Sequence, residues 1–310
     1  MIEKQIEINS GDVVLSGTLT TPTSDSSHSI VLFLHGSGPL DRDENIKGMQ
    51  LNIFNKIAFD LAKRNIASFR YDKRGCSKST GDYYTSGFDD LIVDATACAK
   101  WLSEQSEFTE LILLGHSEGT LIAPIVSQRV KSVGRLVLLC PFLKNLETVL
   151  VAQSKDQEKA ISKMSGIKGF TARLMMKYII SPVKYQKKLI KRIKSSNQDS
   201  FKMMFQRIPA KWLRELMAVE PREFYEKIDI ATLLLIADKD VQCDPADGDE
   251  IQNILGSLAT KVNMPNLTHI LRNDPNEHTI LSYKKLLKQP IDKEVLQVIG
   301  NWLKKSKPAN

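Results

Sequence analysis

The sequence Gly-His-Ser-Glu-Gly at residues 115–119 constrains this chain more than any other feature. It follows 111–114, a short apolar run typical of a buried strand, and precedes an apolar stretch that reads as the start of a helix. A Gly-x-Ser-x-Gly turn in that context is typical of a nucleophile elbow, in which Ser117 is held in a strained conformation. Gly115 and Gly119 remove side chains that would collide there. We expect an exposed nucleophilic hydroxyl; the alternative is a serine that only caps the helix.

Short apolar strands alternate with helical patterns on both sides of this turn. The predicted strands are 2–8, 13–20, 30–34, 66–71, 111–114, 135–140, 231–236 and 261–264. Helical spacing marks 53–61, 88–101 and a closing amphipathic helix at 292–304. The first two strands read as an antiparallel edge hairpin. The alternation predicts an α/β fold: a mostly parallel eight-stranded sheet with helices on both faces.

The strand rhythm breaks after Pro141 and resumes near 231. Between residues 142 and 230 there are 19 Lys or Arg and 9 Asp or Glu, in a chain whose net charge is +7. The segment also holds six methionines, which suit either a variable pocket or irregular core gaps. We predict an α/β core made of 1–141 and 226–310, and an inserted helical cap over 142–225. A solvated helical surface is the plainest interpretation of the charge.

Composition excludes several classes of function. The start of the chain has no apolar core of signal-peptide length, and no apolar run is long enough to span a bilayer, so we expect a cytoplasmic protein without stable membrane insertion. No nucleic-acid motif accompanies the basic residues. The cysteines are far apart and predict free thiols, with no disulfide framework or metal site: Cys76, Cys98, Cys140 and Cys243. The oligomeric state stays open.

A serine nucleophile needs a base and an acid that orients the base, and in this kind of sheet they follow Ser117 in the order acid, then histidine. His269 lies in a turn-rich stretch just past the last predicted strand, where a loop at the carboxyl edge of the sheet would lie. It is favoured over His278, which lies in a polar loop. The acid should follow strand 231–236; Asp240 is the first choice and Asp238 the second.

The remaining candidates have structural interpretations. We expect His116, inside the elbow, to point away from the nucleophile, and His28 to lie in a surface loop. Asp244 and Asp247 suit the cap of a helix after Pro245 better than they suit catalysis.

Residues 35–38 read His-Gly-Ser-Gly and directly follow the predicted strand 30–34. Glycines such as Gly36 let the backbone approach a bound acyl group. His35, directly before Gly36, is part of the same motif. We expect the backbone N–H groups of Ser37 and Glu118 to form an oxyanion hole. Loss of one such donor costs roughly 3 kcal/mol of transition-state stabilisation.

A family resemblance follows from five strings taken together. They are 35–43 (His-Gly-Ser-Gly-Pro-Leu-Asp-Arg-Asp), 69–75 (Phe-Arg-Tyr-Asp-Lys-Arg-Gly), 115–119, 238–242 (Asp-Lys-Asp-Val-Gln) and 266–269 (Asn-Leu-Thr-His). In this order, and over about residues 20 to 305, the chain resembles the α/β-hydrolases. Within them it looks like the serine carboxylesterase group of EstD-like or serine aminopeptidase-like hydrolases.

The resemblance implies a Ser117, Asp240, His269 triad and hydrolysis of small-molecule carboxylic esters through an acyl-enzyme, with no cofactor. Two alternatives stay open. The cap could select acyl-CoA thioesters or peptide N-termini, or the scaffold could be a ligand-binding protein without catalysis. Basic cap residues would favour anionic substrates only if some of them face the pocket; the candidates are Lys168, Lys177, Lys184, Lys188 and Lys191.

The chain departs from the pattern of this group at three places. Ala237 and Thr268 stand where the group usually has Gly and Asn, and a Gly common near Ser77 is absent. These differences affect loop geometry, but all the predicted reacting groups are present.

Overall fold

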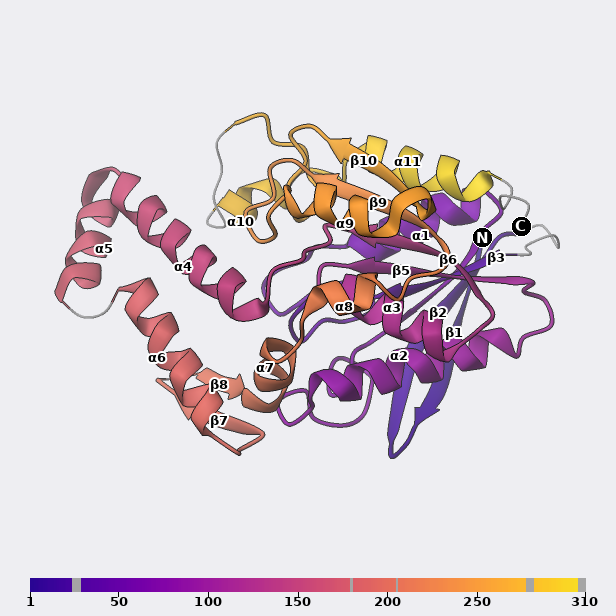
Figure 1. Ribbon diagram of the computed structural model, residues 1–310, viewed down its shortest axis with the longest axis horizontal. Coiled ribbons are helices and arrows are strands. Elements are labelled where there is room, and N and C mark those ends of the chain that lie inside the picture. The colour runs from indigo at the N-terminus through magenta and orange to yellow at the C-terminus, as the bar shows by residue number, and fades with distance from the viewer. Residues whose placement is uncertain (24–28, 179–180, 205, 277–281, 306–310) are drawn as a thin grey trace.

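One eight-stranded sheet forms the centre of the molecule in the computed structural model, which describes residues 1–23, 29–178, 181–204, 206–276 and 282–305 (Figure 1). The strand order is β1-β2-β4-β3-β5-β6-β9-β10. Neighbours from β4 through β10 are parallel, whereas β2 is antiparallel to both β1 and β4. The bounds are β1 Ile2–Ser10, β2 Val13–Thr21, β3 Ser29–Leu34, β4 Ala67–Tyr71, β5 Glu110–His116, β6 Val133–Leu139, β9 Ala231–Ala237 and β10 Ala259–Met264. The predicted fold class is confirmed.

The central strands are apolar on both faces because helices cover both faces. In β3, Ile30, Leu32 and Leu34 belong to one core cluster, while the alternate residues Val31 and Phe33 belong to the other. The first cluster is covered by α2 (Phe88–Ser103), α3 (Gly119–Arg129) and α9 (Asp247–Leu255). The second is covered by α1 (Ile53–Lys63), α10 (Tyr283–Leu286) and α11 (Lys293–Lys304). A short 3-10 turn, Gly256–Leu258, precedes β10.

The chain between β6 and β9 leaves the sheet and forms a mostly helical arm (Figure 1). Its elements are α4 Leu146–Lys163, α5 Gly166–Tyr178, α6 Pro182–Ser195, β7 Ser200–Met203, β8 Gln206–Pro209, α7 Ala210–Met217 and α8 Pro221–Tyr225. We call residues 142–225, the predicted cap, the cap segment. Figure 1 places α5 at the end of the arm farthest from the sheet.

The helical pattern predicted for the cap segment does not hold at β7 and β8, which pair as an antiparallel hairpin. Phe201, Met203 and Ile208 are buried and alternate with polar residues, so period-two spacing decides the structure there. The Arg192 guanidinium also lies 4.2 Å from the centre of the Phe201 ring. The alternation of apolar and polar residues is present in the sequence, but two strands of four residues each are too short for their period to be recognised between long helices.

Helix starts in the cap segment follow ordinary capping chemistry. The Asn145 side chain accepts from the Glu147 N–H at the start of α4, and the Ser181 side chain accepts from the Lys184 N–H at the start of α6. Asn145 also donates to the Met217 carbonyl oxygen, which ties the start of α4 to the end of α7. Among the described helices, none combines the length and apolarity needed to cross a bilayer.

Candidate active site

Ser117 occupies the sharp turn between β5 and α3, with a left-handed φ of 52°. Its N–H donates to the Leu139 carbonyl oxygen at 3.0 Å. A Cβ on Gly115 would lie 2.3 Å from the Gly119 carbonyl oxygen, and one on Gly119 would lie 2.1 Å from the Leu34 carbonyl oxygen. Both positions therefore require glycine, because backbone atoms approach too closely for any side chain.

His269 and Asp240 come from two loops that follow β10 and β9 at the carboxyl edge of the sheet. His269 Nδ1 lies 2.6 Å from Asp240 Oδ2, and the two side chains are only 6% and 2% exposed. The other carboxylate oxygen accepts the N–H groups of Gln242 and Cys243 at 2.7 and 2.9 Å. These bonds hold Asp240 as an acceptor, so Nδ1 of His269 carries the proton and Nε2 is left to act as a base.

Cys243 lines the same cavity as Ser117. Burial raises the pKa of the Cys243 thiol well above its ordinary value, the charges of Asp240 and Asp247 raise it further, and a hydrogen bond with Ser117 opposes them. Among the described residues no hydrogen bond joins Ser117 to the His269 ring. Catalytic hydrogen bonds are often loose before substrate binds, and rotation about the serine Cα–Cβ bond changes this contact.

The loop after β3 is held from two sides at Gly36. The Gly36 N–H donates to Glu44 Oε1 at 2.7 Å, and the Gly36 carbonyl oxygen accepts from Lys73 Nζ at 2.6 Å. Lys73 also pairs with Glu118 Oε2 at 2.8 Å, and these two side chains are 3% and 0% exposed. Glu118 in turn accepts from Trp212 Nε1 at 2.5 Å. One buried lysine thus joins the loop to the residue that follows Ser117, and Trp212 of α7 in the cap segment contacts the same glutamate.

His116, on the other side of the nucleophile, forms a second buried ion pair. Its Nδ1 lies 2.8 Å from Glu44 Oε2 and its Nε2 lies 3.0 Å from the His269 carbonyl oxygen. Both partners are acceptors, so both ring nitrogens donate and the imidazole is charged. Burial lowers the pKa of His116, but the charge and hydrogen bond of Glu44 outweigh it, and the pKa is raised.

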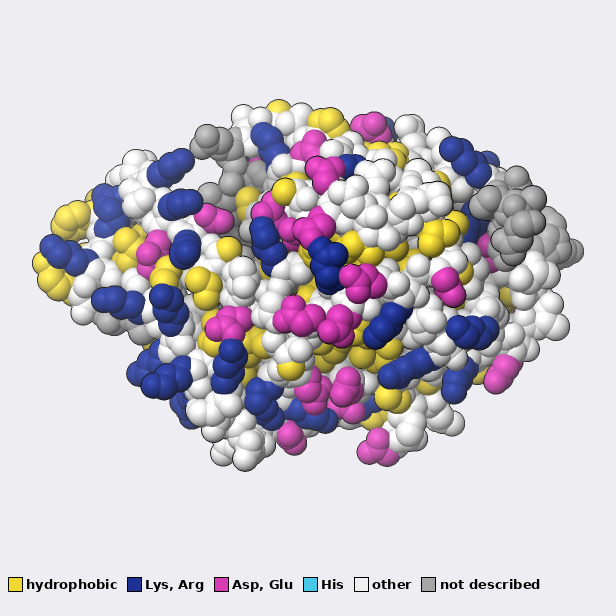
Figure 2. Space-filling model, in the orientation of Figure 1, with side chains coloured by type: hydrophobic (Ala, Val, Ile, Leu, Met, Phe, Trp, Pro, Cys, Tyr) yellow, Lys and Arg dark blue, Asp and Glu magenta, His cyan; other side chains and the backbone are white. Residues whose placement is uncertain are grey.

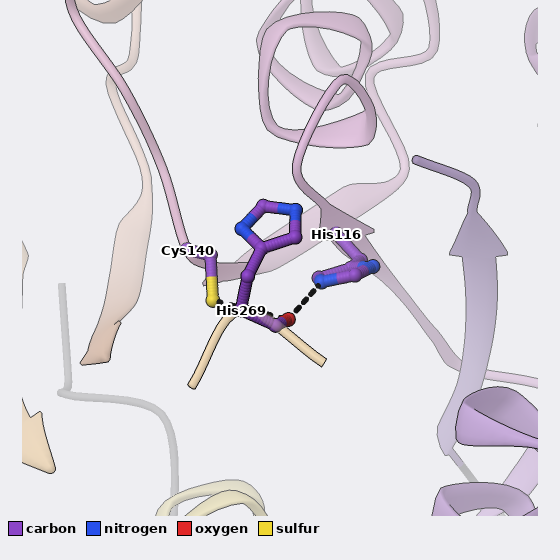
Figure 3. A group of neighbouring side chains, drawn as sticks. All are labelled: His116, Cys140 and His269. Carbon is purple, nitrogen blue, oxygen red and sulfur yellow. Dashed lines mark hydrogen bonds between the residues drawn. The ribbon is translucent and has the colours of Figure 1, made fainter. Parts of the chain in front are cut away.

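Figure 3 shows the His116 and His269 rings side by side, with His116 directed at the His269 backbone. The ring centres are 5.0 Å apart. The Cys140 thiol points at the same carbonyl oxygen, at 3.8 Å. The expected structural role of His116 is thus more specific than the sequence indicated: it fixes the backbone that carries His269.

Two groups of potential metal ligands lie at this site: His116, Cys140 and His269, and Asp240, Cys243 and His269. Hydrogen bonds already occupy both nitrogens of His116 and Nδ1 of His269. Burial is the leading reason that the pKa values of both thiols are raised, which keeps them from becoming thiolate ligands. These donors fit a hydrogen-bonded network better than a resident metal ion.

A cavity of about 620 Å³ opens over Ser117 and His269. Its walls are mostly apolar and come from both the core and the cap segment; they include Leu40, Ile46, Met49, Leu51, Phe142, Leu146, Val149, Leu150, Trp212, Leu216 and Ile270. Among the described lining residues, Lys284 is the one lysine or arginine and Glu44 the one carboxylate, and the charge of Glu44 is paired with that of His116.

Of the five lysines considered as candidates to face the pocket, the four whose side chains the structure describes do not line it. Lys177, Lys184, Lys188 and Lys191 are exposed on the outside of the cap segment, and the side chain of Lys168 is outside the described residues. The basic character of the cap segment therefore belongs to its outer surface.

The alternative site residues lie elsewhere or outside the described part. Asp238 is exposed, whereas Asp240 meets His269. Asp244 accepts the Ala246 N–H just before α9 and pairs with Lys144. His28 and His278 lie outside the described residues.

His35 packs between aromatic rings below the loop. Its ring centre is 5.4 Å from that of Phe54 and 4.9 Å from that of Tyr71. Burial, with a smaller effect of the Lys73 charge, lowers the pKa of His35 to about 4. It is therefore neutral at physiological pH and supports the loop by packing.

Sequence reasoning named the elbow serine, the acid–histidine pair and the loop, but missed the side chains that hold them: Glu44, Lys73, the carboxylate of Glu118 and Trp212. The string Asp-Lys-Arg-Gly at 72–75 was noticed as part of a resemblance. It carried no indication that its lysine is buried beside the elbow.

Comparisons with known proteins agree on the family and the fold. The family model described as "Serine aminopeptidase, S33" matches residues 27–276. Esterase EstD of Thermotoga maritima is 26% identical over 307 residues, which are 98% of this chain and 68% of EstD. Est1E of Butyrivibrio proteoclasticus, solved with ferulic acid bound, superposes with a TM-score of 0.61 at 12% identity, over 97% of this chain and 100% of Est1E. Esterase Pf2001 of Pyrococcus furiosus gives 0.58 at 16% identity, over 98% and 92%.

Proposed function

Because this chain belongs to the serine aminopeptidase S33 family, we propose that it hydrolyses carboxylic esters of small to medium acyl substrates through an acyl-enzyme on Ser117. The observation that carries the proposal is the pairing of His269 with a buried Asp240 in the same cavity as an elbow serine. The name of the relative EstD supports ester hydrolysis as the reaction.

In the first half-reaction the Ser117 hydroxyl turns to His269 Nε2 and attacks the ester carbonyl carbon. Nε2 takes the hydroxyl proton, and Asp240 stabilises the imidazolium through Nδ1. The tetrahedral intermediate then collapses: the C–O bond to the alcohol breaks, and His269 returns the proton to the leaving oxygen. Water, deprotonated by the same nitrogen, then attacks the acyl-serine. The bond between the acyl carbon and Ser117 Oγ breaks, His269 returns the proton to Oγ, and the acid is released.

The N–H groups of Ser37 and Glu118 are the proposed donors to the oxyanion. The Gly36–Ser37 peptide is trans, so its N–H points opposite to its carbonyl oxygen. Lys73 binds that carbonyl oxygen and so fixes the direction of the Ser37 N–H. The same ammonium holds the side chain of Glu118, so one cation positions the residues that supply both donors.

The cavity favours esters over the main alternatives. Release of an N-terminal residue needs an anion to hold the α-ammonium group, but the lining carboxylate, Glu44, is already paired with charged His116. An acyl-CoA carries several phosphates, and Lys284 is the lining cation available to meet them. The apolar remainder suits an uncharged acyl group.

A fluorophosphonate probe followed by mass mapping tests the nucleophile, and p-nitrophenyl esters from acetate to laurate test the acyl preference. We expect an adduct on Ser117 and faster turnover of short and medium chains than of laurate. Aminoacyl p-nitroanilides serve as the matched peptide-type substrates. An adduct elsewhere, or Ser117→Ala with full activity, would contradict the mechanism; better turnover of the anilides would favour the aminopeptidase alternative.

A further inference from the structure

The helix α5 exposes one continuous apolar face. Ile167, Phe170, Leu174, Met175 and Tyr178 are 84%, 61%, 47%, 60% and 69% exposed. Positions three, four and seven apart share a side of a helix, so these residues form a single stripe. Such a concentration is unusual, because exposed large apolar side chains are normally scattered singly.

The opposite side of α5 accounts for how the helix is held. Gly169 is buried, and a Cβ there would lie 2.2 Å from the Met164 carbonyl oxygen, so the backbone packs closely against the end of α4. Ala172 and Met176, on the same side as Gly169, are half-buried. The helix thus uses a small-residue face for packing within the cap segment and leaves its larger apolar face outward.

Cations surround this apolar face. Residues 146–195 hold 12 Lys or Arg and 3 Asp or Glu. Four of these cations are exposed and come from the end of α4, from α5 itself and from the start of α6: Lys159, Lys163, Lys177 and Lys184. Figure 2 shows dark blue side chains beside yellow ones at the end of the molecule where Figure 1 places α5. None of these four lysines lines the active-site cavity.

An apolar helix face bordered by lysines is complementary to the surface of an anionic lipid bilayer. Apolar side chains enter the boundary between headgroups and acyl chains, and the ammonium groups meet lipid phosphates. A second copy of this chain is a poorer match, because the same strongly cationic surface would face itself. We propose that the α5 face, together with its lysine border, docks this protein reversibly on anionic membranes. Docking of this kind needs no spanning helix and does not depend on the proposed chemistry.

Vesicle sedimentation with the full chain tests the proposal, using phosphatidylcholine alone and phosphatidylcholine with 30% phosphatidylglycerol. We expect at least tenfold stronger binding to the anionic vesicles, and weaker binding as salt is raised, since salt screens the lysine contribution. The double variant Phe170→Ser/Leu174→Ser should lose at least tenfold in vesicle affinity. The double variant Lys177→Glu/Lys184→Glu should bind anionic vesicles more weakly, whereas its affinity for neutral vesicles should equal that of the wild type.

Val93→Ser is the matched control, because Val93 on α2 is 47% exposed, as Leu174 is, but lies outside the cap segment. It should leave vesicle binding unchanged, and thermal melting should show that each variant is folded. Equal binding of the wild type to both vesicle types, or no binding, would overturn the proposal. So would a dimer in sedimentation velocity that Phe170→Ser/Leu174→Ser abolishes, since the face would then be an interface between copies.

Discussion

Charges around the elbow are buried and paired, whereas those on the outside of the cap segment are exposed to solvent. Lys73 and Glu118 are 3% and 0% exposed and lie 2.8 Å apart, while Lys188 and Lys191 are exposed on α6. A buried charge that loses its partner costs several kcal/mol, but an exposed pair contributes about 1 kcal/mol or less. The elbow network should therefore be intolerant of substitution, and the cap surface should be free to change without affecting the chemistry.

The largest effect should follow from loss of the nucleophile or of the acid. Ser117→Ala should abolish acyl-enzyme formation, and Asp240→Asn should lower kcat by about 10⁴-fold, because an amide no longer holds His269 in the active tautomer. Burst kinetics with a p-nitrophenyl ester measure both. Asp238→Asn is the control, and its kcat should stay within twofold of the wild-type value. A greater loss of kcat in Asp238→Asn than in Asp240→Asn would show that Asp238 is the acid of the triad.

Lys73→Met should give the next largest effect. It frees the Gly36 carbonyl oxygen and leaves Glu118, among the described residues, with Trp212 as its one side-chain partner. We therefore expect a 10²- to 10³-fold lower kcat and about 3–5 kcal/mol less stability. KM should change little, because the oxyanion forms only after binding. Lys73→Met/Glu118→Gln should recover stability without recovering kcat. Recovery of both would show that Lys73 only stabilises the fold.

His116 should make stability depend on pH in a defined window. Its pKa is raised in the folded chain above the ordinary 6.5, so above about pH 6.5 the folded state keeps a proton that the unfolded state releases. The stabilisation is complete below that pH and is lost as pH rises through the folded pKa. Urea unfolding of wild type and His116→Gln from pH 6.5 upward measures this: the wild type should lose stability faster with pH. A steeper loss in the variant would contradict the charged pair.

The smallest effect should come from the cap surface. Lys188→Gln/Lys191→Gln should change kcat/KM by less than about twofold for a neutral ester and for a matched ester with a carboxylate, since both lysines lie outside the cavity and salt screens them over about 10 Å. A salt series with both esters is the measurement. A loss of kcat/KM for the anionic ester alone would show that these cap lysines do influence substrate binding at the active site.

Local pattern decided much of what could be predicted. Apolar runs located the eight strands of the sheet, and the Gly-x-Ser-x-Gly turn located Ser117, because strand period and glycine spacing are properties of neighbouring residues. Chain order and loop position favoured Asp240 over Asp238 and His269 over His278, and the structure pairs the two favoured side chains. The same reasoning failed at β7 and β8, where four-residue strands carry too few repeats for their period to be distinguished from that of a helix.

The sequence by itself determined the fold class, the family and the predicted reacting residues of this chain. Only the tertiary structure decided which side chains hold these residues in place. The hydrogen bonds of Glu44 with His116, Lys73 with Glu118 and Trp212 with Glu118 join residues that are 72, 45 and 94 positions apart in the sequence. Only the tertiary structure decided, too, that the cap lysines face away from the cavity and that the apolar face of α5 is left uncovered. Secondary-structure propensity depends on residues within one or two helical turns of each other. The ion pairs of buried charges form only when folding brings distant segments together, so residue spacing in the sequence does not predict them.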